Sequence, residues 1–469
     1  MKSHILFIAL MLSAAVTFAQ KPFSKGRLKV SDNQRYLVHQ DGTPFFWLGD
    51  TAWELFHRLS KPEADQYLQH RAKQGFTVVQ AVALAEIDGL NTPNAEGAVP
   101  LENNDPAKPN EAYFKHVDYI IDKAAENGIV IALLPTWGDK VFKDKWGKGP
   151  EIFNVSNAAA FGEWIGNRYK NRENVVWVLG GDRTPRNDSD DVKVWRMMAE
   201  GVARGTGGND HALMSFHPQP NGLTMGGSSN WFHNDSWLDF NMLQNGHCRD
   251  EITYDKIAFV YNKKPVKPVL DAEPIYEDHP VCFNAADLGT SNAYDVRKYA
   301  YLDLFAGAFG HTYGCHDVWQ MYDKNREPLN GPHLPWHEAL DLPGARQMTY
   351  VRRLMESRPM LERVPDQSLV EENYNGPANR VQATRGKDYA FIYVSTGTPV
   401  TVHAGKITGK EFSAHWYDPR KGEATKIGNF PNQGKHQFKA PTSGYGKDWV
   451  LILDDAGKKY DVDFAAQAK

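Results

Sequence analysis

Eight short apolar runs recur along the first three quarters of the chain, and helical patterns separate them. A buried parallel strand reads as a continuous apolar run, and strands that alternate with helices predict a parallel sheet with right-handed crossovers. Eight such repeats predict an α/β fold, a closed (β/α)8 TIM barrel. The runs occupy residues 45–48, 77–83, 129–134, 175–179, 212–216, 240–243, 268–270 and 312–315.

The segments between the runs carry helix signals. Ser60 and Glu63 form a capping box with Pro62 in the first turn, and Phe114 and Val117 begin an apolar repeat at helical spacing. Three long segments rich in Asn, Pro and Gly are expected as loops on the C-terminal face of the barrel, where they would shape a substrate pocket. These segments are residues 85–110, 219–237 and 275–292.

The pattern changes to strict alternation near Pro365, and turn residues separate the alternating runs. Period-two alternation predicts half-buried antiparallel strands, so the C-terminal part is expected to be an all-β sandwich. The first twenty residues combine Lys2, an apolar core and a small residue at Ala19, which is typical of a secretory signal peptide. The expected domains are a signal peptide at residues 1–20, a barrel at 21–364 and a β-sandwich at 365–469.

Composition narrows the class of protein. The net charge is −4 and no basic stripe is present, which argues against a nucleic-acid partner. No later stretch approaches the ~18 apolar residues of a membrane span. We therefore expect an exported protein, periplasmic or extracellular. The three cysteines, Cys248, Cys282 and Cys315, give no disulfide framework or zinc motif; one Cys248–Cys282 or Cys282–Cys315 bridge and buried free thiols are both compatible with them.

Two acidic residues stand just past apolar runs, Asp182 after residues 175–179 and Glu273 after 268–270. They are 91 positions apart, about 30 for each of three repeats, which places them after strands 4 and 7 of the barrel. Two carboxylates across one pocket are the minimal equipment for breaking a glycosidic bond, one as proton donor and the other as nucleophile or base. The competing interpretation of a single strand-end acid is a helix cap. The pair favours catalysis.

Other polar and aromatic residues follow the strands and are candidates for contacting a sugar. The histidines are expected to bind hydroxyls or to orient the carboxylates, and the absence of a His-x-x-x-His or paired-Cys motif argues against a metal or other cofactor. Asp50 is a candidate for a hydroxyl-binding or a structural role, and Asp271 for a buried structural one. The full set of candidate substrate-binding residues is Asp50, Trp53, Trp137, His217, Asn245, His247, His316, Asp317 and Trp319.

Several motifs together resemble one known family. They are Gly49-Asp50-Thr51-Ala52-Trp53 with its flanking residues, Val178-Leu179-Gly180-Gly181-Asp182, Asp271-Ala272-Glu273-Pro274, Gly310-His311-Thr312-Tyr313-Gly314, and His415-Trp416-Tyr417-Asp418-Pro419. The first four are similar to the apiosidase-like barrel of glycoside hydrolase family 140. The last resembles the C-terminal β-domain that accompanies this barrel, a type labelled collagen-binding.

The resemblance implies an apiosidase that cleaves apiosyl–galacturonate links in rhamnogalacturonan II, a pectin. It implies Asp182 as acid/base and Glu273 as nucleophile, with a plant cell-wall oligosaccharide as the partner molecule. The carboxylate separation decides between retention, at ~5–5.5 Å, and inversion, at ~6.5–9.5 Å, and the sequence leaves this open. The alternatives are a barrel of the same kind acting on another furanoside or pyranoside, a non-catalytic carbohydrate-binding protein, and a metal-dependent hydrolase.

Overall fold

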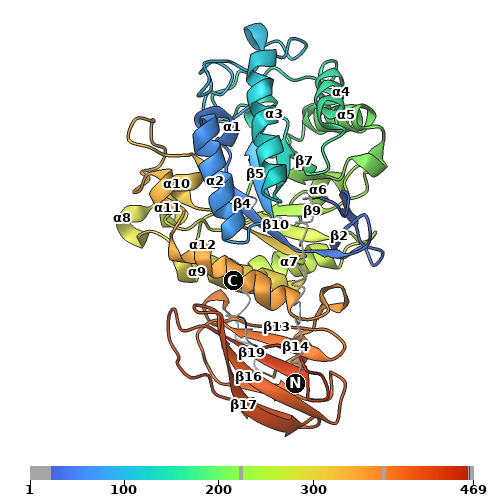
Figure 1. Cartoon of the computed structure of the whole chain (residues 1–469), viewed down its shortest axis with the longest axis vertical. Coiled ribbons are helices and arrows are strands. Elements are labelled where there is room, and N and C mark those ends of the chain that lie inside the picture. The colour runs from blue at the N-terminus through green and yellow to red at the C-terminus, as the bar shows by residue number, and fades with distance from the viewer. Residues whose placement is uncertain (1–22, 221–224, 372–375, 463, 465–469) are drawn as a thin grey trace, which may run out of the picture.

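The computed structural model describes residues 23–220, 225–371, 376–462 and 464, so the expected signal peptide at residues 1–20 lies outside the described part of the chain. A barrel forms the larger part and an antiparallel β-domain lies below it in Figure 1. A small sheet of β1 (Leu28–Val30), β2 (Leu37–His39) and β3 (Pro44–Phe45) precedes the barrel.

Eight parallel strands build the barrel, as the apolar runs predict. Six form one sheet in the order β11-β4-β5-β6-β7-β8, and β10 pairs with β9. Backbone hydrogen bonds from Asp239 to Met214 and from Phe309 to Val269 connect the two sheets. The (β/α)8 prediction is therefore confirmed. The strands are β4 (Trp47–Thr51), β5 (Val78–Val82), β6 (Val130–Leu134), β7 (Val175–Gly180), β8 (Met214–His217), β9 (Asn241–Gln244), β10 (Val269–Glu273) and β11 (Gly310–Tyr313).

Helices surround these strands (Figure 1). The predicted capping box at Ser60 and Glu63 starts α2, and the Ser60 backbone N–H donates to Glu63 Oε2 at 2.8 Å. The long helices are α2 (Lys61–Lys73), α3 (Glu111–Glu126), α4 (Ala158–Tyr169), α5 (Asp191–Thr206), α7 (Thr253–Tyr261), α9 (Ala293–Ala306) and α12 (Pro343–Glu356). Shorter ones are α1 (Leu55–Arg58), α6 (Ser229–Phe232), α8 (Ala285–Leu288), α10 (His316–Trp319) and α11 (Trp336–Ala339).

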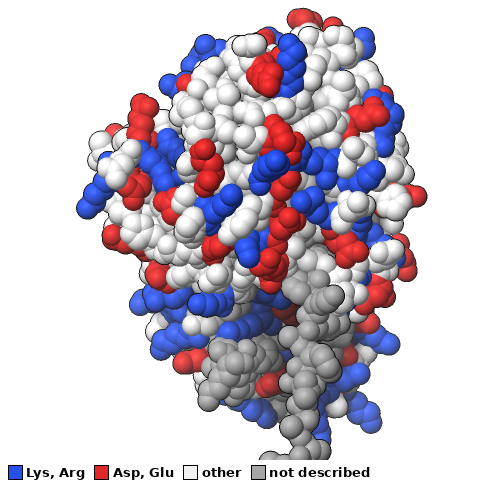
Figure 2. Space-filling model, turned by 45° about the horizontal axis from the view of Figure 1, so that its top comes forward, with Lys and Arg blue, Asp and Glu red and all other residues white. Residues whose placement is uncertain are grey.

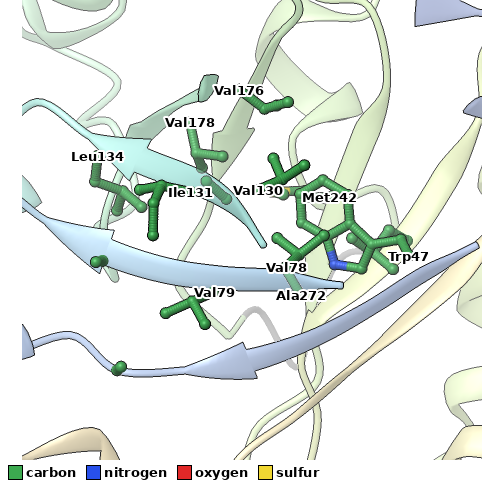
Figure 3. Packing of buried hydrophobic residues seen from close by; sticks show 14 of the residues in the cluster. Trp47, Val78, Val79, Val130, Ile131, Leu134, Val176, Val178, Met242 and Ala272 are labelled. Carbon is green, nitrogen blue, oxygen red and sulfur yellow. The ribbon is translucent and has the colours of Figure 1, made fainter. Parts of the chain in front are cut away.

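The barrel interior is closely packed with apolar side chains. Figure 3 shows Trp47, Val78, Val130 and Met242 meeting from different strands. All four side chains are fully buried, which is what strands covered on both faces require. This layer fills the barrel near the amino ends of the strands, and the site is expected at their carboxyl ends.

The C-terminal part is a β-sandwich of unequal sheets. The larger sheet has the order β12-β13-β14-β19-β16-β17, and β15 pairs with β18. The polar, exposed patterns of β17 and β18 explain why alternation in the sequence does not predict these two strands. The bounds are β12 (Val364–Pro365), β13 (Val381–Arg385), β14 (Tyr389–Val394), β15 (Val400–His403), β16 (Glu411–Asp418), β17 (Glu423–Pro431), β18 (Lys435–Phe438) and β19 (Trp449–Asp455).

The large sheet of the β-domain packs on the barrel through α9. Along β14, Ala390 and Ile392 face the core of the sandwich, whereas Phe391 and Tyr393 belong to the core of the barrel. Tyr393 stacks on Tyr301 of α9, with ring centroids 5.0 Å apart. Helix α9 is therefore buried between the two domains.

Acidic and basic side chains are interspersed over the face of the barrel shown in Figure 2. Among the helices that the structure describes, none is long and apolar enough to cross a membrane.

Candidate active site

A cavity of about 680 Å³ opens at the carboxyl ends of the barrel strands, and it contains both candidate carboxylates. Residues at or just past the carboxyl ends of all eight barrel strands line it, including Gln219 and Pro220 after β8. The lining includes Trp53, Glu86, Trp137, Trp146, Asp182, Gln244, Asn245, His247, Lys256, Glu273, Tyr276, His279, Phe283, Trp319 and Asn330.

Backbone geometry fixes Asp182 at the end of β7. Gly180, Gly181 and Asp182 all have positive φ, at 90°, 114° and 52°. A Cβ on Gly180 would lie 2.3 Å from the carbonyl oxygen of His217, and one on Gly181 would lie 2.7 Å from the Trp137 ring. The two glycines are therefore required by the close approach of neighbouring protein groups.

The Asp182 carboxyl is held at the cavity wall by two donors. Trp146 donates its indole N–H to Oδ2 at 3.1 Å, and Arg183 Nη1 lies 3.5 Å from the same oxygen. The side chain is 19% exposed. Burial and the nearby charge of Glu273 outweigh Arg183 and His217 and raise the pKa of Asp182 to about 6. Asp182 can therefore hold a proton in mildly acidic solution.

Glu273, the last residue of β10, lies between two imidazoles. His217 Nε2 is 3.2 Å from Oε2, and His247 Nε2 is 3.2 Å from Oε1. The carboxyl side chain is 7% exposed. Burial raises its pKa, but the interactions with His217 and His247 outweigh burial and lower the pKa of Glu273 to about 2. Glu273 is therefore ionised where Asp182 is protonated.

Each imidazole is itself fixed by packing. His247 stacks on His279 with ring centroids 4.0 Å apart, and His217 meets the edge of Trp53 at 5.2 Å. A disulfide joins Cys248, next to His247, to Cys282, and Cys315 is free and buried. The Cys248–Cys282 disulfide is one of the two pairings that the sequence allows, and it connects the loops after β9 and β10.

Asn245 and Asp271 support Glu273 from below. Asn245 donates its amide to Asp271 Oδ2 at 2.7 Å, and its backbone N–H donates to the Glu273 carbonyl at 3.1 Å. Asp271 is fully buried inside β10, in the structural role that its position two residues before Glu273 suggests. Asn245 also lines the cavity. Its hydrogen bond to the buried Asp271 fixes the orientation of its side chain.

Three predicted aromatic residues form part of the wall. Trp53 and Trp137 have ring centroids 5.0 Å apart, and Trp319 lies across the end of β11. All three side chains are at most 8% exposed. Flat rings in such a wall can pack against the apolar face of a sugar.

Four candidate residues, Asp50, His217, His316 and Asp317, are not among those that line the cavity, although His217 lies 3.2 Å from Glu273. Asp50 lies within β4, not past its end, and its Oδ2 accepts from Tyr67 Oη and Arg71 Nε, both at 2.6 Å. Asp317 accepts the backbone N–H groups of His333 and Leu334. The contacts of Asp50 and Asp317 are structural, which favours the alternative role considered for Asp50. His316 lies behind the wall, where its Nδ1 accepts from the Trp319 indole at 3.3 Å.

Several cavity residues were not singled out from the sequence. Trp146 and Phe283 are exposed by 47% and 64%, and each comes from a loop whose path no local pattern specifies. His279 lacks any motif. Glu86 follows the apolar run at residues 77–83, and this position is the sequence feature that places it near the cavity. The run alone does not indicate a role for the side chain. Among the described residues, no group of three His, Cys, Asp or Glu side chains is arranged to hold a metal ion.

Comparison with known proteins agrees with this geometry. Residues 31–362 match the family model described as "Apiosidase-like, catalytic domain", and residues 364–454 match "Putative collagen-binding domain of a collagenase". A structure described as "Glycoside hydrolase" is 36% identical, with 95% of this chain and 100% of that chain covered and a TM-score of 0.85. A structure described as a glycoside hydrolase family 5 from Bacteroides vulgatus ATCC 8482 is 35% identical, with 94% and 96% covered and a TM-score of 0.85.

A search of curated protein sequences gave no match. The family model nevertheless spans well over half of the chain, and both structural relatives extend over nearly all of it. The chain therefore belongs to the apiosidase-like family of glycoside hydrolases, and it is a glycosidase.

Proposed function

We propose that this glycosidase is an exported apiosidase that cleaves apiosyl–galacturonate links in rhamnogalacturonan II, in the periplasm or outside the cell. The apiosyl substrate is supported by the match of residues 31–362 to the apiosidase-like family model. The two-carboxylate mechanism is supported best by the opposite shift of two carboxyl groups in one cavity, because the pKa of Asp182 is raised to about 6 and that of Glu273 is lowered to about 2. One acid is protonated and the other ionised over the intervening pH range, which is the state that glycoside cleavage needs.

In the first step, the Glu273 carboxylate attacks the anomeric carbon while Asp182 protonates the departing oxygen. The transition state carries positive charge on the sugar, and the fixed negative charge of Glu273 stabilises it. His217 and His247 hold the two oxygens of Glu273 in place, which keeps the attacking oxygen oriented. The products are the free aglycone and a glycosyl–Glu273 ester.

In the second step, ionised Asp182 accepts a proton from water, and the resulting hydroxide attacks the anomeric carbon. Glu273 leaves as a carboxylate and Asp182 regains its proton. Both carboxyl groups end in their starting states without any further reactant. The expected outcome is retention of anomeric configuration.

Stereochemistry is tested by following the first product with proton NMR and by adding methanol to the reaction. A retaining enzyme releases the sugar with its original anomeric configuration and transfers some of it to methanol. Initial release of the opposite anomer, with no methyl glycoside, would show that Glu273 acts as a base that activates water and not as a nucleophile.

Substrate identity is tested by incubating the purified protein with apiosyl–galacturonate oligosaccharides and with a panel of other furanosides and pyranosides. Release of apiose, or of a fragment ending in apiose, is expected. Release of a different sugar would assign the same barrel to another plant polysaccharide. Asp182→Asn and Glu273→Gln should each lower the rate by about 10²–10⁴-fold or more. Asp188→Asn, on the exposed part of the same loop as Asp182, is the matched control and should leave it unchanged.

A further inference from the structure

A third carboxyl group, Glu86, lines the cavity beside the proposed acid. The backbone around it is fixed on every side. Ala83 O accepts from Tyr113 Oη at 2.7 Å, Leu84 O accepts from the Trp137 backbone N–H at 3.1 Å, and Ala85 O accepts from Lys140 Nζ at 2.5 Å. On the other side, the Ile87 N–H donates to Glu54 Oε1 at 3.1 Å. Glu86 therefore stands at a rigid position after β5.

The side chain of Glu86 differs from the acids around it because it makes no hydrogen bond or ion pair within the part of the chain that the structure describes. Asp139 is paired with Lys140 at 2.7 Å and accepts the Gly149 N–H at 2.9 Å. Glu54 is paired with His57 at 2.6 Å. A carboxyl group that faces a cavity without a protein donor can take a hydrogen-bonding group of a ligand as its partner.

The surroundings of Glu86 are negative. Burial raises its pKa well above the usual range, and the charges of Asp182, Asp139 and Glu54 act in the same direction against the opposing effect of Arg183. A neutral carboxylic acid has one O–H donor and a carbonyl acceptor. This pair of groups matches a sugar hydroxyl, which also donates once and accepts.

We propose that Glu86 binds a hydroxyl group of the sugar substrate, and so contributes to substrate selection. This inference rests on the proposed role of the cavity as the active site. Because Asp182 and Glu86 line the same cavity and lie close enough for the charge of Asp182 to act on Glu86, we expect the hydroxyl that Glu86 binds to belong to a sugar unit adjoining the scissile bond.

The test compares Glu86→Gln, Glu86→Ala and Glu86→Met at pH 5, using the glycoside that the wild-type enzyme cleaves. Gln keeps a neutral donor and acceptor, so kcat/KM should stay within about 3-fold of wild type. Ala and Met remove both groups and should lower kcat/KM by about 3–10-fold, mainly through KM. Glu102→Ala, exposed in the same long loop, is the control and should have no effect. Thermal unfolding of each variant separates a binding effect from a folding defect, and Met retains volume if Ala does not fold.

Deoxy analogues of the substrate make the assignment specific. Removing the hydroxyl that Glu86 binds should lower kcat/KM of the wild-type enzyme by about the same factor as Glu86→Ala does. The same deoxy substrate should lower kcat/KM of the Ala or Met variant little further, because the hydrogen bond is already absent. Wild-type kinetics in both Ala and Met variants would overturn the proposal, as would a Gln variant as impaired as Ala. The fall of about 10²–10⁴-fold expected for Asp182→Asn tests the proposed function separately from the role of Glu86.

Discussion

The indole Nε1 of Trp146 donates a hydrogen bond to Oδ2 of Asp182 at 3.1 Å. Trp146 is 47% exposed, and the Arg183 guanidinium lies over its ring at 4.8 Å. An exposed aromatic side chain thus reaches into the cavity from the loop after β6 and fixes the orientation of the proposed acid. Because the indole only donates, it favours the ionised form of Asp182 and moderates the effect of burial on its pKa.

Trp146→Phe is expected to raise the pKa of Asp182 while keeping an aromatic ring in the cavity. A neutral hydrogen bond contributes about 0.5–1.5 kcal/mol, which corresponds to about 0.4–1 pH unit. The alkaline limb of the kcat/KM profile should therefore move upward by that amount. An alkaline limb that does not move, or that moves downward, would contradict the role given to the indole.

The wild-type pH profile should be bell-shaped, with limbs set by the two carboxyl groups. Asp182 must be protonated to assist departure of the aglycone, so activity should fall as the pH rises through about 6. Glu273 must be ionised to attack, so activity should fall only as the pH drops toward about 2. Measuring kcat/KM from pH 3 to pH 8 checks the alkaline limb in the free enzyme.

An activated aryl glycoside provides the control for this assignment, because its leaving group needs little protonation. With that substrate, Asp182→Asn should retain measurable activity and lose the alkaline limb. Persistence of the same limb in the variant would assign it to another group in the cavity, such as Glu86.

Much of the barrel can be predicted from the sequence because strands covered on both faces need unbroken apolar runs. The positions of Asp182, Glu273 and Asn245 follow from the same rule, since the residue after such a run lies at the carboxyl end of the barrel. The rule is less precise about where a strand ends. Residues 45–48 suggest an end before Asp50, whereas β4 continues to Thr51, and Asp50 therefore projects toward α2.

The rest of the site depends on contacts that local sequence does not encode. Trp146 and Phe283 enter the cavity because long loops fold back over the barrel, and His279 because it stacks on His247. The pairing of Cys248 with Cys282 likewise follows from the proximity of two loops that are 34 residues apart in sequence. Such relationships become visible only when the strands are arranged in space.

His247→Ala is expected to raise the pKa of Glu273, because it removes one of the two imidazoles that lower it. The acid limb of kcat/KM should therefore move upward and enter the measurable range. The rate at the optimum should fall too, since Oε1 loses the group that orients it at 3.2 Å. His337→Ala, on the partly exposed α11, is the matched control. An unchanged acid limb in His247→Ala would show that His217 alone determines the ionisation of Glu273.

The β-domain is joined to the barrel through α9, which leads into β11 and packs against that strand. Arg297 of α9 forms a bidentate pair with Asp448, at 2.8 and 2.6 Å, and neither side chain is more than 3% exposed. Tyr393 also donates to Asp448 at 3.1 Å. Although residues 364–454 match a domain type named for collagen binding, these contacts support a bracing role for the large sheet.

Arg297→Met should therefore destabilise the whole protein and not the β-domain alone. It leaves Asp448 buried without its cation, which costs about 3–5 kcal/mol, whereas Arg297→Met combined with Asp448→Leu should recover much of that loss because neither charge remains.

Urea unfolding followed by fluorescence and by glycosidase activity measures both effects. We expect one transition in which activity and fluorescence are lost together, since barrel and β-domain share a hydrophobic core. Arg204→Met, whose partner Glu163 is on the surface, should change stability by no more than about 1 kcal/mol. Two separate transitions, with activity retained after the β-domain unfolds, would contradict the bracing role.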